Sequence, residues 1–307
     1  MATFGRLITA MATPFDEQRE VDYGQAARLA KGLIACGSDS LVVAGTTGES
    51  PTLSDEEKIR LFTDVKAAVG TRAQVIAGTG NYNTRESVEL TRRAEEAGVD
   101  GILLVVPYYN KPPQEGLYQH FRAIAEATHL PCILYNVPSR TVLNMTADTV
   151  VRLSEIDNIV GVKEASGNLE QVGEIITRAR RGFLVYSGND SDTLPILSLG
   201  GFGVVSVASH LVGERIAEMI RRAVDGELES AASIHREVMP LVKALFQTTS
   251  PIPLKAALNL LGFSMGTPRL PLIELDPKST ESLRTLLGRM KLDSYLTADA
   301  VAAARAG

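Results

Sequence analysis

The sequence predicts a single (β/α)8 barrel of the α/β class, followed by a C-terminal helical extension. Three observations lead to this prediction: eight short apolar runs recur up to residue 206, helical patterns separate them, and no linker interrupts the series. Near-continuous apolar runs are typical of strands buried on both faces, as in a parallel sheet. Strands that alternate with helices in one unbroken series favour a closed barrel.

The eight apolar runs are the expected barrel strands. In chain order they cover residues 7–10, 40–44, 74–78, 101–106, 132–135, 159–162, 183–186 and 203–206. A doubly wound sheet is the alternative architecture. It requires a glycine fingerprint after the first strand, and residues 9–14 (Thr-Ala-Met-Ala-Thr-Pro) do not supply one.

Helical periodicity lies between the runs, at residues 23–35, 55–69, 85–97, 114–128, 147–154 and 169–180. Ser54 and Glu57 form a capping-box pattern at the start of the second helix. Gly98 follows the third helix as a stop signal.

From about Leu211 onward the pattern is helical, with candidate helices at 214–225, 229–247, 254–261 and 279–292. The first of these helices completes the barrel. We therefore assign residues 1–225 to the catalytic barrel and residues 226–307 to the C-terminal extension.

Composition narrows the class of protein. The 307 residues carry 31 Lys and Arg against 36 Asp and Glu, a net charge of −5, without a basic stripe, which argues against a nucleic-acid partner. No apolar stretch reaches the ~18 residues of a membrane span. No signal peptide is visible, and the two cysteines have no metal or redox spacing, so we expect a cytoplasmic protein.

Known cofactor and hydrolase motifs are missing from the sequence. The four histidines lack metal-ligand spacing, and neither a Gly-x-Ser-x-Gly elbow nor a Walker-type loop occurs. We therefore expect neither a metal nor an organic cofactor.

The chemistry is expected where the strands end, because barrel enzymes place their sites at the C-terminal ends of strands. Lys163 ends the sixth apolar run. A buried lysine loses its charge readily and becomes a nucleophile, and its attack on a ketone forms an imine. The alternative is a strand-end lysine that reaches into solvent.

Hydroxyl groups and one guanidinium follow the neighbouring runs. Tyr135 ends the fifth run and is a candidate proton relay. Thr46, Thr47 and Tyr109 could extend a hydroxyl chain from Tyr135 to water, and Arg140 could bind a carboxylate through its planar fork. The plainer alternatives are a core tyrosine, a capped turn and a solvated loop arginine.

Four segments at barrel-like intervals carry a family resemblance. They are residues 45–50 (Gly-Thr-Thr-Gly-Glu-Ser), 107–112 (Pro-Tyr-Tyr-Asn-Lys-Pro), 135–141 (Tyr-Asn-Val-Pro-Ser-Arg-Thr) and 162–168 (Val-Lys-Glu-Ala-Ser-Gly-Asn). Together they resemble the dihydrodipicolinate synthase family, within the pyruvate-dependent N-acetylneuraminate lyase superfamily. The likeness runs from about Leu7 to at least Pro271.

This resemblance implies a specific condensation. Lys163 would form an imine with pyruvate, and the enamine would attack the aldehyde of L-aspartate-4-semialdehyde. Cyclisation would release 4-hydroxy-tetrahydrodipicolinate on the diaminopimelate route to L-lysine. Tyr135 would relay protons, and Arg140 would bind the carboxylate of the semialdehyde.

The resemblance also implies roles for residues around the lysine. Thr46 would join Tyr135 to Tyr109, and Tyr109 would reach across a dimer interface into the partner subunit's site. Thr47 would hold the pyruvate carboxylate, and Gly188 and Val205 would line the pyruvate pocket. The implied assembly is a homotetramer, a dimer of dimers, that the C-terminal helices support.

Some members of this family bind L-lysine as a feedback inhibitor at the dimer interface. The matching positions here are Ser50, Pro51, Asp55, Lys58, Tyr82, Glu86 and Tyr108. Asp55 and Lys58 replace histidines of sensitive enzymes, and Tyr82 replaces an asparagine. A fixed cation at Lys58 disfavours a cationic ligand unless it meets the ligand's carboxylate. We therefore expect weak or absent inhibition, while Glu86 has a plain alternative role beside an Asn83 helix cap.

Two further functions stay open on the residues alone. A related pyruvate-dependent aldolase, such as an N-acetylneuraminate lyase or a 2-keto-3-deoxy sugar-acid aldolase, shares the imine lysine and the tyrosine. Arg140 argues for an aldehyde derived from an amino acid over a polyol chain. A catalytically silent barrel that only binds ligands is the other alternative, because fold alone does not determine function.

Overall fold

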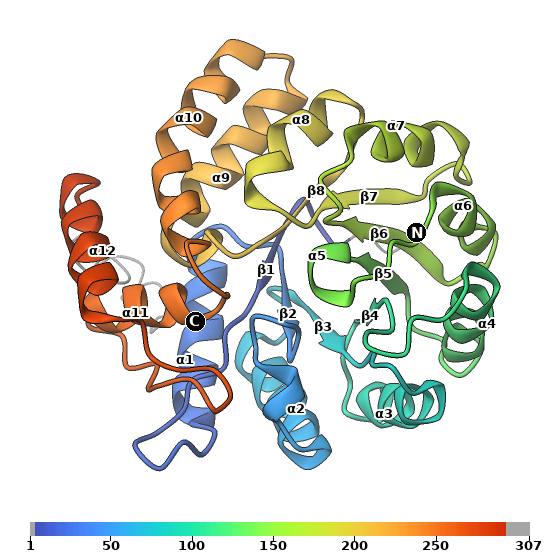
Figure 1. Cartoon of the computed structure of the whole chain (residues 1–307), viewed down its shortest axis with the longest axis horizontal. Coiled ribbons are helices and arrows are strands. Elements are labelled where there is room, and N and C mark those ends of the chain that lie inside the picture. The colour runs from blue at the N-terminus through green and yellow to red at the C-terminus, as the bar shows by residue number, and fades with distance from the viewer. Residues whose placement is uncertain (1–3, 293–307) are drawn as a thin grey trace.

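The structure, a computed structural model, describes residues 4–292 of the chain and shows one closed parallel barrel (Figure 1). Its eight strands follow one another around the barrel in chain order, and β1 closes the ring by pairing with β8. Helices surround the barrel on its outside, and the helices after α9 lie to one side of it. The predicted fold class is confirmed.

All eight strands form where the apolar runs predicted them. They are β1 (Leu7–Ala10), β2 (Ser40–Val43), β3 (Gln74–Gly78), β4 (Gly101–Val105), β5 (Cys132–Asn136), β6 (Ile159–Glu164), β7 (Leu184–Ser187) and β8 (Gly203–Ser206). The main difference lies at β6, which runs one residue past Lys163 to include Glu164. Pairing with β5 on one side and β7 on the other extends the strand through these two polar residues.

The helices within the described residues are as follows. They are α1 (Tyr23–Ala35), α2 (Asp55–Val69), α3 (Thr84–Glu96), α4 (Gln114–Ala125), α5 (Pro138–Thr141), α6 (Ala147–Ser154), α7 (Leu169–Arg178), α8 (Thr193–Ser198), α9 (Ser209–Val224), α10 (Leu228–Leu245), α11 (Ile252–Leu260) and α12 (Pro277–Arg289), with the 3₁₀ helices η1 (Ser50–Thr52) and η2 (Asp190–Asp192). The capping box of α2 is present as predicted.

Several helices end earlier than their sequence pattern predicts, and at α4 and α7 side chains from other elements bind the backbone groups near the end. Asn158 donates to the carbonyl oxygens of Ala125 and Thr128 (2.9 and 3.1 Å), which ends α4 at Ala125. The Ser154 hydroxyl accepts from the amide of Arg180 (3.1 Å), and α7 stops two residues before it. In contrast α9 begins at residue 209, before the expected 214, with a kink at residue 212.

The barrel interior and the outer layer form separate apolar clusters. Ile8, Val42, Ile133 and Val205 meet inside the barrel, each almost fully buried. Phe4 closes the end of the barrel where the strands begin, since a Cβ added at Gly101 there would lie 2.3 Å from its ring. The open end is therefore the one at which the strands end, where the candidate residues lie.

The C-terminal segment continues the helical ring. Helices α9 and α10 lie side by side, and α11 and α12 pack against each other and against α10 (Figure 1). The domain boundary at residue 225 stays a prediction, and the part of the expected extension beyond residue 292 lies outside the described residues. Of the helices in residues 4–292, none is both long and apolar enough to cross a membrane.

Candidate active site

Lys163 and Tyr135 face each other at the open end of the barrel. Tyr135 of β5 lies directly opposite Lys163 of β6 in the strand register, and residues so paired point to the same side of a sheet. Both residues are only 5% exposed. The Lys163 Nζ lies 4.1 Å from the centre of the Tyr135 ring. The structure therefore buries the lysine and excludes the solvent-reaching alternative.

Burial changes the acidity of the Lys163 amine. It lowers the pKa of Lys163 to about 7, the nearby charge of Asp190 opposes this effect, and Arg140 adds to it. A large share of such an amine is uncharged near neutral pH, which is the form that attacks a carbonyl. Burial therefore gives the Lys163 amine the charge state that attack on a carbonyl requires.

Asp190 is a site residue that the sequence analysis did not single out. It is buried at the start of η2, where it accepts from the Ser206 hydroxyl (2.5 Å) and from the amides of Val207 and Ala208 (3.0 and 3.1 Å). Burial raises the pKa of Asp190, while these donors and Lys163 lower it. The one signal in the sequence was an acidic residue just after the seventh apolar run.

Thr46 and Tyr135 lie close enough for the Thr46 side chain to influence the acidity of the tyrosine. Burial raises the pKa of Tyr135, while Arg140 and, to a smaller extent, the Thr46 side chain lower it. Thr46, Tyr135 and Arg140 line one cavity of about 220 Å³, together with Ser50 and Tyr108. Its size suits a small ligand held by a few polar groups.

Thr47, Gly188 and Val205 differ in their relation to this site. Thr47 is buried next to Thr46, and Val205 is buried inside the barrel on β8. A Cβ added at Gly188 would lie 3.1 Å from Lys163 Cγ and 2.7 Å from Ala165 Cβ. Glycine at this position therefore leaves room for the lysine side chain.

Arg140 reaches the cavity from α5, a short helix that the periodicity did not reveal. The Thr141 hydroxyl donates to the Leu143 carbonyl (2.9 Å) and helps to hold this turn. The Arg140 side chain donates to the carbonyl of Ser250 (3.4 Å), which precedes α11. The guanidinium thus lies at the edge of the cavity, supported by the C-terminal segment.

Tyr109 is not brought to Tyr135 within one chain. It is 93% exposed, the most exposed of the large apolar side chains among the described residues. Its backbone has φ of 75°, a region that costs a non-glycine residue free energy. The loop therefore holds the Tyr109 side chain outward, away from the cavity of its own subunit.

The expected effector residues form two small groups. The rings of Tyr82 and Tyr108 pack edge to face with centres 5.1 Å apart. Glu86 accepts from the side-chain amides of Asn81 and Asn83 (3.1 and 2.7 Å). It therefore lies beside the Asn83 helix cap, as its plain alternative role requires. Burial raises the pKa of Tyr108, with smaller effects of Tyr82 and Glu86.

Lys58 belongs to the second of these groups. Its Nζ lies 3.2 Å from a carboxylate oxygen of Asp55, and its side chain is 13% exposed. The pair is neutral overall, so Asp55 offsets much of the repulsion that Lys58 would exert on a cationic ligand.

Across residues 4–292, no cluster of three or more His, Cys, Asp or Glu side chains is arranged to hold a metal ion.

Comparison with known proteins gives one consistent result. The family model of the dihydrodipicolinate synthetase family matches residues 3–290. The 4-hydroxy-tetrahydrodipicolinate synthase of Dehalococcoides mccartyi is 58% identical over 293 residues, which is 95% of this chain and 99% of the relative. That of Heliobacterium modesticaldum is 59% identical over 291 residues, with 95% and 97% covered.

A solved structure agrees with these relatives. The dihydrodipicolinate synthase of Cyanidioschyzon merolae, determined with lysine bound, has a TM-score of 0.93 and 52% identity. The similarity covers 94% of this chain and 99% of that one.

Proposed function

Because the chain belongs to the dihydrodipicolinate synthetase family, we propose that Lys163 forms the imine through which it condenses pyruvate with L-aspartate-4-semialdehyde. The chain is an enzyme of lysine biosynthesis that makes 4-hydroxy-tetrahydrodipicolinate. The curated relatives, at 58% and 59% identity, favour this reaction over that of a sugar-acid aldolase or a silent barrel. The observation that carries the residue assignment is the buried Lys163 amine beside the Tyr135 ring.

The first half of the reaction loads pyruvate. The uncharged Lys163 amine attacks the ketone carbon of pyruvate, and the carbinolamine loses water to give the imine. Tyr135 donates the proton that the departing hydroxyl needs, and Thr46, which lines the same cavity, passes protons onward. Loss of a methyl proton from the imine then gives the enamine.

The second half forms the carbon–carbon bond. The enamine carbon attacks the aldehyde of L-aspartate-4-semialdehyde, whose oxygen takes up a proton. The amino group of the semialdehyde then attacks the imine carbon and displaces the Lys163 amine. The ring closes as 4-hydroxy-tetrahydrodipicolinate, and the lysine returns to its free form. One water molecule is released over the whole cycle.

Three residues are proposed to bind the substrates. Arg140 at the edge of the cavity matches the carboxylate of the semialdehyde, because its planar fork binds carboxylates bidentately. Thr47 would hold the pyruvate carboxylate. Gly188 gives the space beside Lys163 that the methyl end of pyruvate needs.

We also propose a homotetramer built from two dimers. The support for a functional dimer is Tyr109, which is 93% exposed and does not line the cavity of its own subunit. Placed across a dimer interface, it would extend the Thr46–Tyr135 hydroxyl chain of the neighbouring subunit to water. We further propose that the enzyme works in the cytoplasm, where its metabolites are made.

The response to L-lysine is proposed to be weak or absent. Glu86 is already engaged by Asn81 and Asn83, and Tyr82 is a bulky residue packed against Tyr108. Asp55 pairs with Lys58 and offsets its charge, so repulsion by Lys58 is only weak support for this proposal. The bulk of Tyr82 and the hydrogen bonds that already occupy Glu86 support it better.

The decisive experiment traps the imine. The protein is incubated with pyruvate and borohydride, and the peptide that contains Lys163 is analysed by mass spectrometry. A reduced pyruvate adduct on Lys163 and turnover with the semialdehyde, coupled to the downstream reductase, are expected. N-acetylneuraminate serves as the control substrate, and its cleavage without turnover of the semialdehyde would overturn the proposal.

A further inference from the structure

The loop between β2 and η1 turns sharply and carries Thr46 and Thr47, the two threonines that are proposed to act in the site. The amide of Glu49 donates to the carbonyl of Thr46 (3.1 Å), and the amide of Ser50 donates to that of Gly45 (3.3 Å). Glu49 itself has φ of 57°, in the left-handed region that disfavours residues with a side chain. Such a backbone conformation persists only where surrounding contacts stabilise it, and contacts to the Glu49 side chain do so here.

A buried ion pair holds the side chain of Glu49. Its Oε1 lies 2.6 Å from Nζ of Lys255 in α11, and the two side chains are 0% and 1% exposed. Among the described residues, neither of these two atoms makes a hydrogen bond, so the contact is an ion pair. Burial lowers the pKa of Lys255 to about 8, and the charge of Glu49 opposes this. Removing one partner therefore leaves the other charge buried alone, which is strongly unfavourable.

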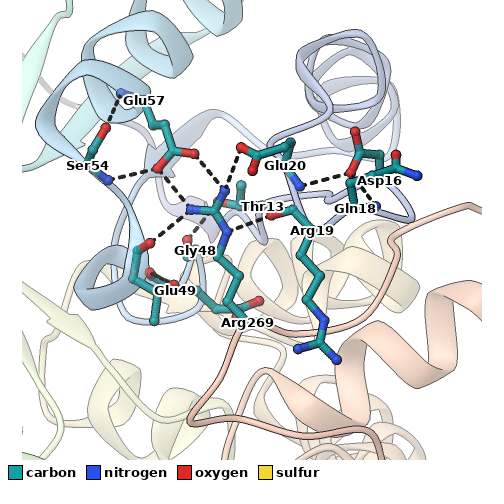
Figure 2. Close-up of polar contacts among 11 residues, drawn as sticks. Thr13, Asp16, Gln18, Arg19, Glu20, Gly48, Glu49, Ser54, Glu57 and Arg269 are labelled. Carbon is teal, nitrogen blue, oxygen red and sulfur yellow. Dashed lines mark hydrogen bonds and ion pairs between the residues drawn. The ribbon is translucent and has the colours of Figure 1, made fainter.

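Arg269 completes the attachment from the same C-terminal segment. Its backbone amide donates to Glu49 Oε2 (2.9 Å), and its guanidinium donates to the carbonyl of Thr52 (2.9 Å) and to both oxygens of Glu57 (2.9 and 2.6 Å). Figure 2 shows the guanidinium between the start of α2 and the N-terminal loop, where the carbonyl of Arg19 also accepts from it (2.7 Å). One residue thus fastens both ends of the segment from residue 49 to residue 57.

The loop is fastened from the barrel side as well. The Thr13 hydroxyl, which follows β1, donates to the carbonyl of Gly48 (2.7 Å; Figure 2). A Cβ added at Gly48 would lie 3.1 Å from the Cα of Ala44, so the turn packs directly on the strand end. Contacts on two sides therefore leave Thr46 and Thr47 little freedom.

From these contacts we propose that Glu49, Lys255 and Arg269 are positioning residues that hold Thr46 and Thr47 for the reaction of Lys163 with pyruvate. The inference rests on the proposed function, and it gives the C-terminal segment a part in catalysis. None of the three lines the cavity, so they act through the loop. The same segment supports Arg140 through the Ser250 carbonyl, which extends its reach to the second substrate.

The test compares three variants at a temperature well below their melting points. Lys255→Met and the isosteric Glu49→Gln each leave one buried group without its partner. Both should lower kcat/KM for pyruvate about tenfold or more, because small displacements of a positioning group are costly. The rate of borohydride-trapped adduct formation should fall in parallel, and kcat/KM for the semialdehyde should fall less. The double variant Glu49→Gln/Lys255→Met leaves no charge stranded and should recover most of the loss.

A second ion pair provides the matched control. Lys66 of α2 lies 2.7 Å from Asp100, each side chain 27% exposed, at the end of the barrel where β4 begins. Lys66→Met should lower the melting temperature and leave kcat/KM for pyruvate within about twofold, because that end of a barrel serves stability.

The outcomes separate the two proposals. If wild-type protein turns over but Lys255→Met or Glu49→Gln loses only thermal stability, the positioning role is wrong and the proposed function stands. Glu49→Gln keeps the test decisive if Lys255→Met does not fold. A wild-type protein that gives no adduct on Lys163 overturns both proposals together.

Discussion

Replacing Lys163 by methionine should stabilise the protein while it abolishes activity. Burial holds the pKa of Lys163 at about 7, against an ordinary value of 10.5. The folded chain therefore disfavours the proton that the unfolded chain keeps on this amine. Methionine has a similar length and no charge, so Lys163→Met removes the cost of burying an amine and the nucleophile at once.

The size of the effect follows from these two pKa values. Between pH 7 and pH 10.5 the unfolded state binds more protons at this residue than the folded state, so the free energy of unfolding rises with pH. The destabilisation is fully present below pH 7 and is gone above pH 10.5. At about 1.4 kcal/mol for each pH unit, it amounts to about 5 kcal/mol at low pH and about 3 kcal/mol at pH 8.

Urea unfolding at a fixed subunit concentration measures this difference. Lys163→Met should exceed the wild type by about 5 kcal/mol at pH 6 and about 3 kcal/mol at pH 8, with almost no difference near pH 10.5. It should form no borohydride-trapped adduct. A variant that is less stable than the wild type at every pH, or that gains equally at pH 6 and pH 10, would refute the reasoning about burial.

Four further predictions concern the surrounding residues. Tyr109→Phe and Lys163→Ala should each be nearly inactive, yet mixed dimers should recover roughly a quarter of wild-type activity, since half the dimers contain one complete site in two; no recovery on mixing and refolding would contradict a shared site. Arg140→Ala should raise KM for the semialdehyde at least about tenfold and leave the rate of pyruvate adduct formation nearly unchanged, because a lost carboxylate contact costs about 1.5–3 kcal/mol; an equal loss in both steps, measured by steady-state and trapping assays, would remove the assignment. Gly188→Ala should slow trapping of the pyruvate adduct, because the new Cβ would lie 2.7 Å from Ala165 Cβ and 3.1 Å from Lys163 Cγ; unchanged trapping with lowered thermal stability would point to packing alone. L-Lysine should inhibit weakly or not at all, and half-maximal inhibition at sub-millimolar lysine in the steady-state assay would show that Glu86, Tyr82 and Lys58 do form an effector site.

The barrel could be predicted from the sequence, and so could the end of it where the candidate residues lie. Buried strands appear as continuous apolar runs, and a helix cap such as Ser54 with Glu57 involves residues only three positions apart. Both can therefore be predicted without knowledge of the fold. The rule that barrel sites lie at strand ends then selected Lys163 and Tyr135. The short helices α5 and α8 were not predicted, because four and six residues are too few to show helical periodicity.

The tertiary structure decided what depends on distant residues. Where α4 and α7 end is set by Asn158 and Ser154, which lie on other elements. The hold on Glu49 comes from Arg269, 220 residues away in the chain. From the sequence alone, the Lys163 side chain could either reach into solvent or be a buried nucleophile. The closed barrel leaves Lys163 only 5% exposed and lowers its pKa to about 7, which excludes the solvent-reaching alternative.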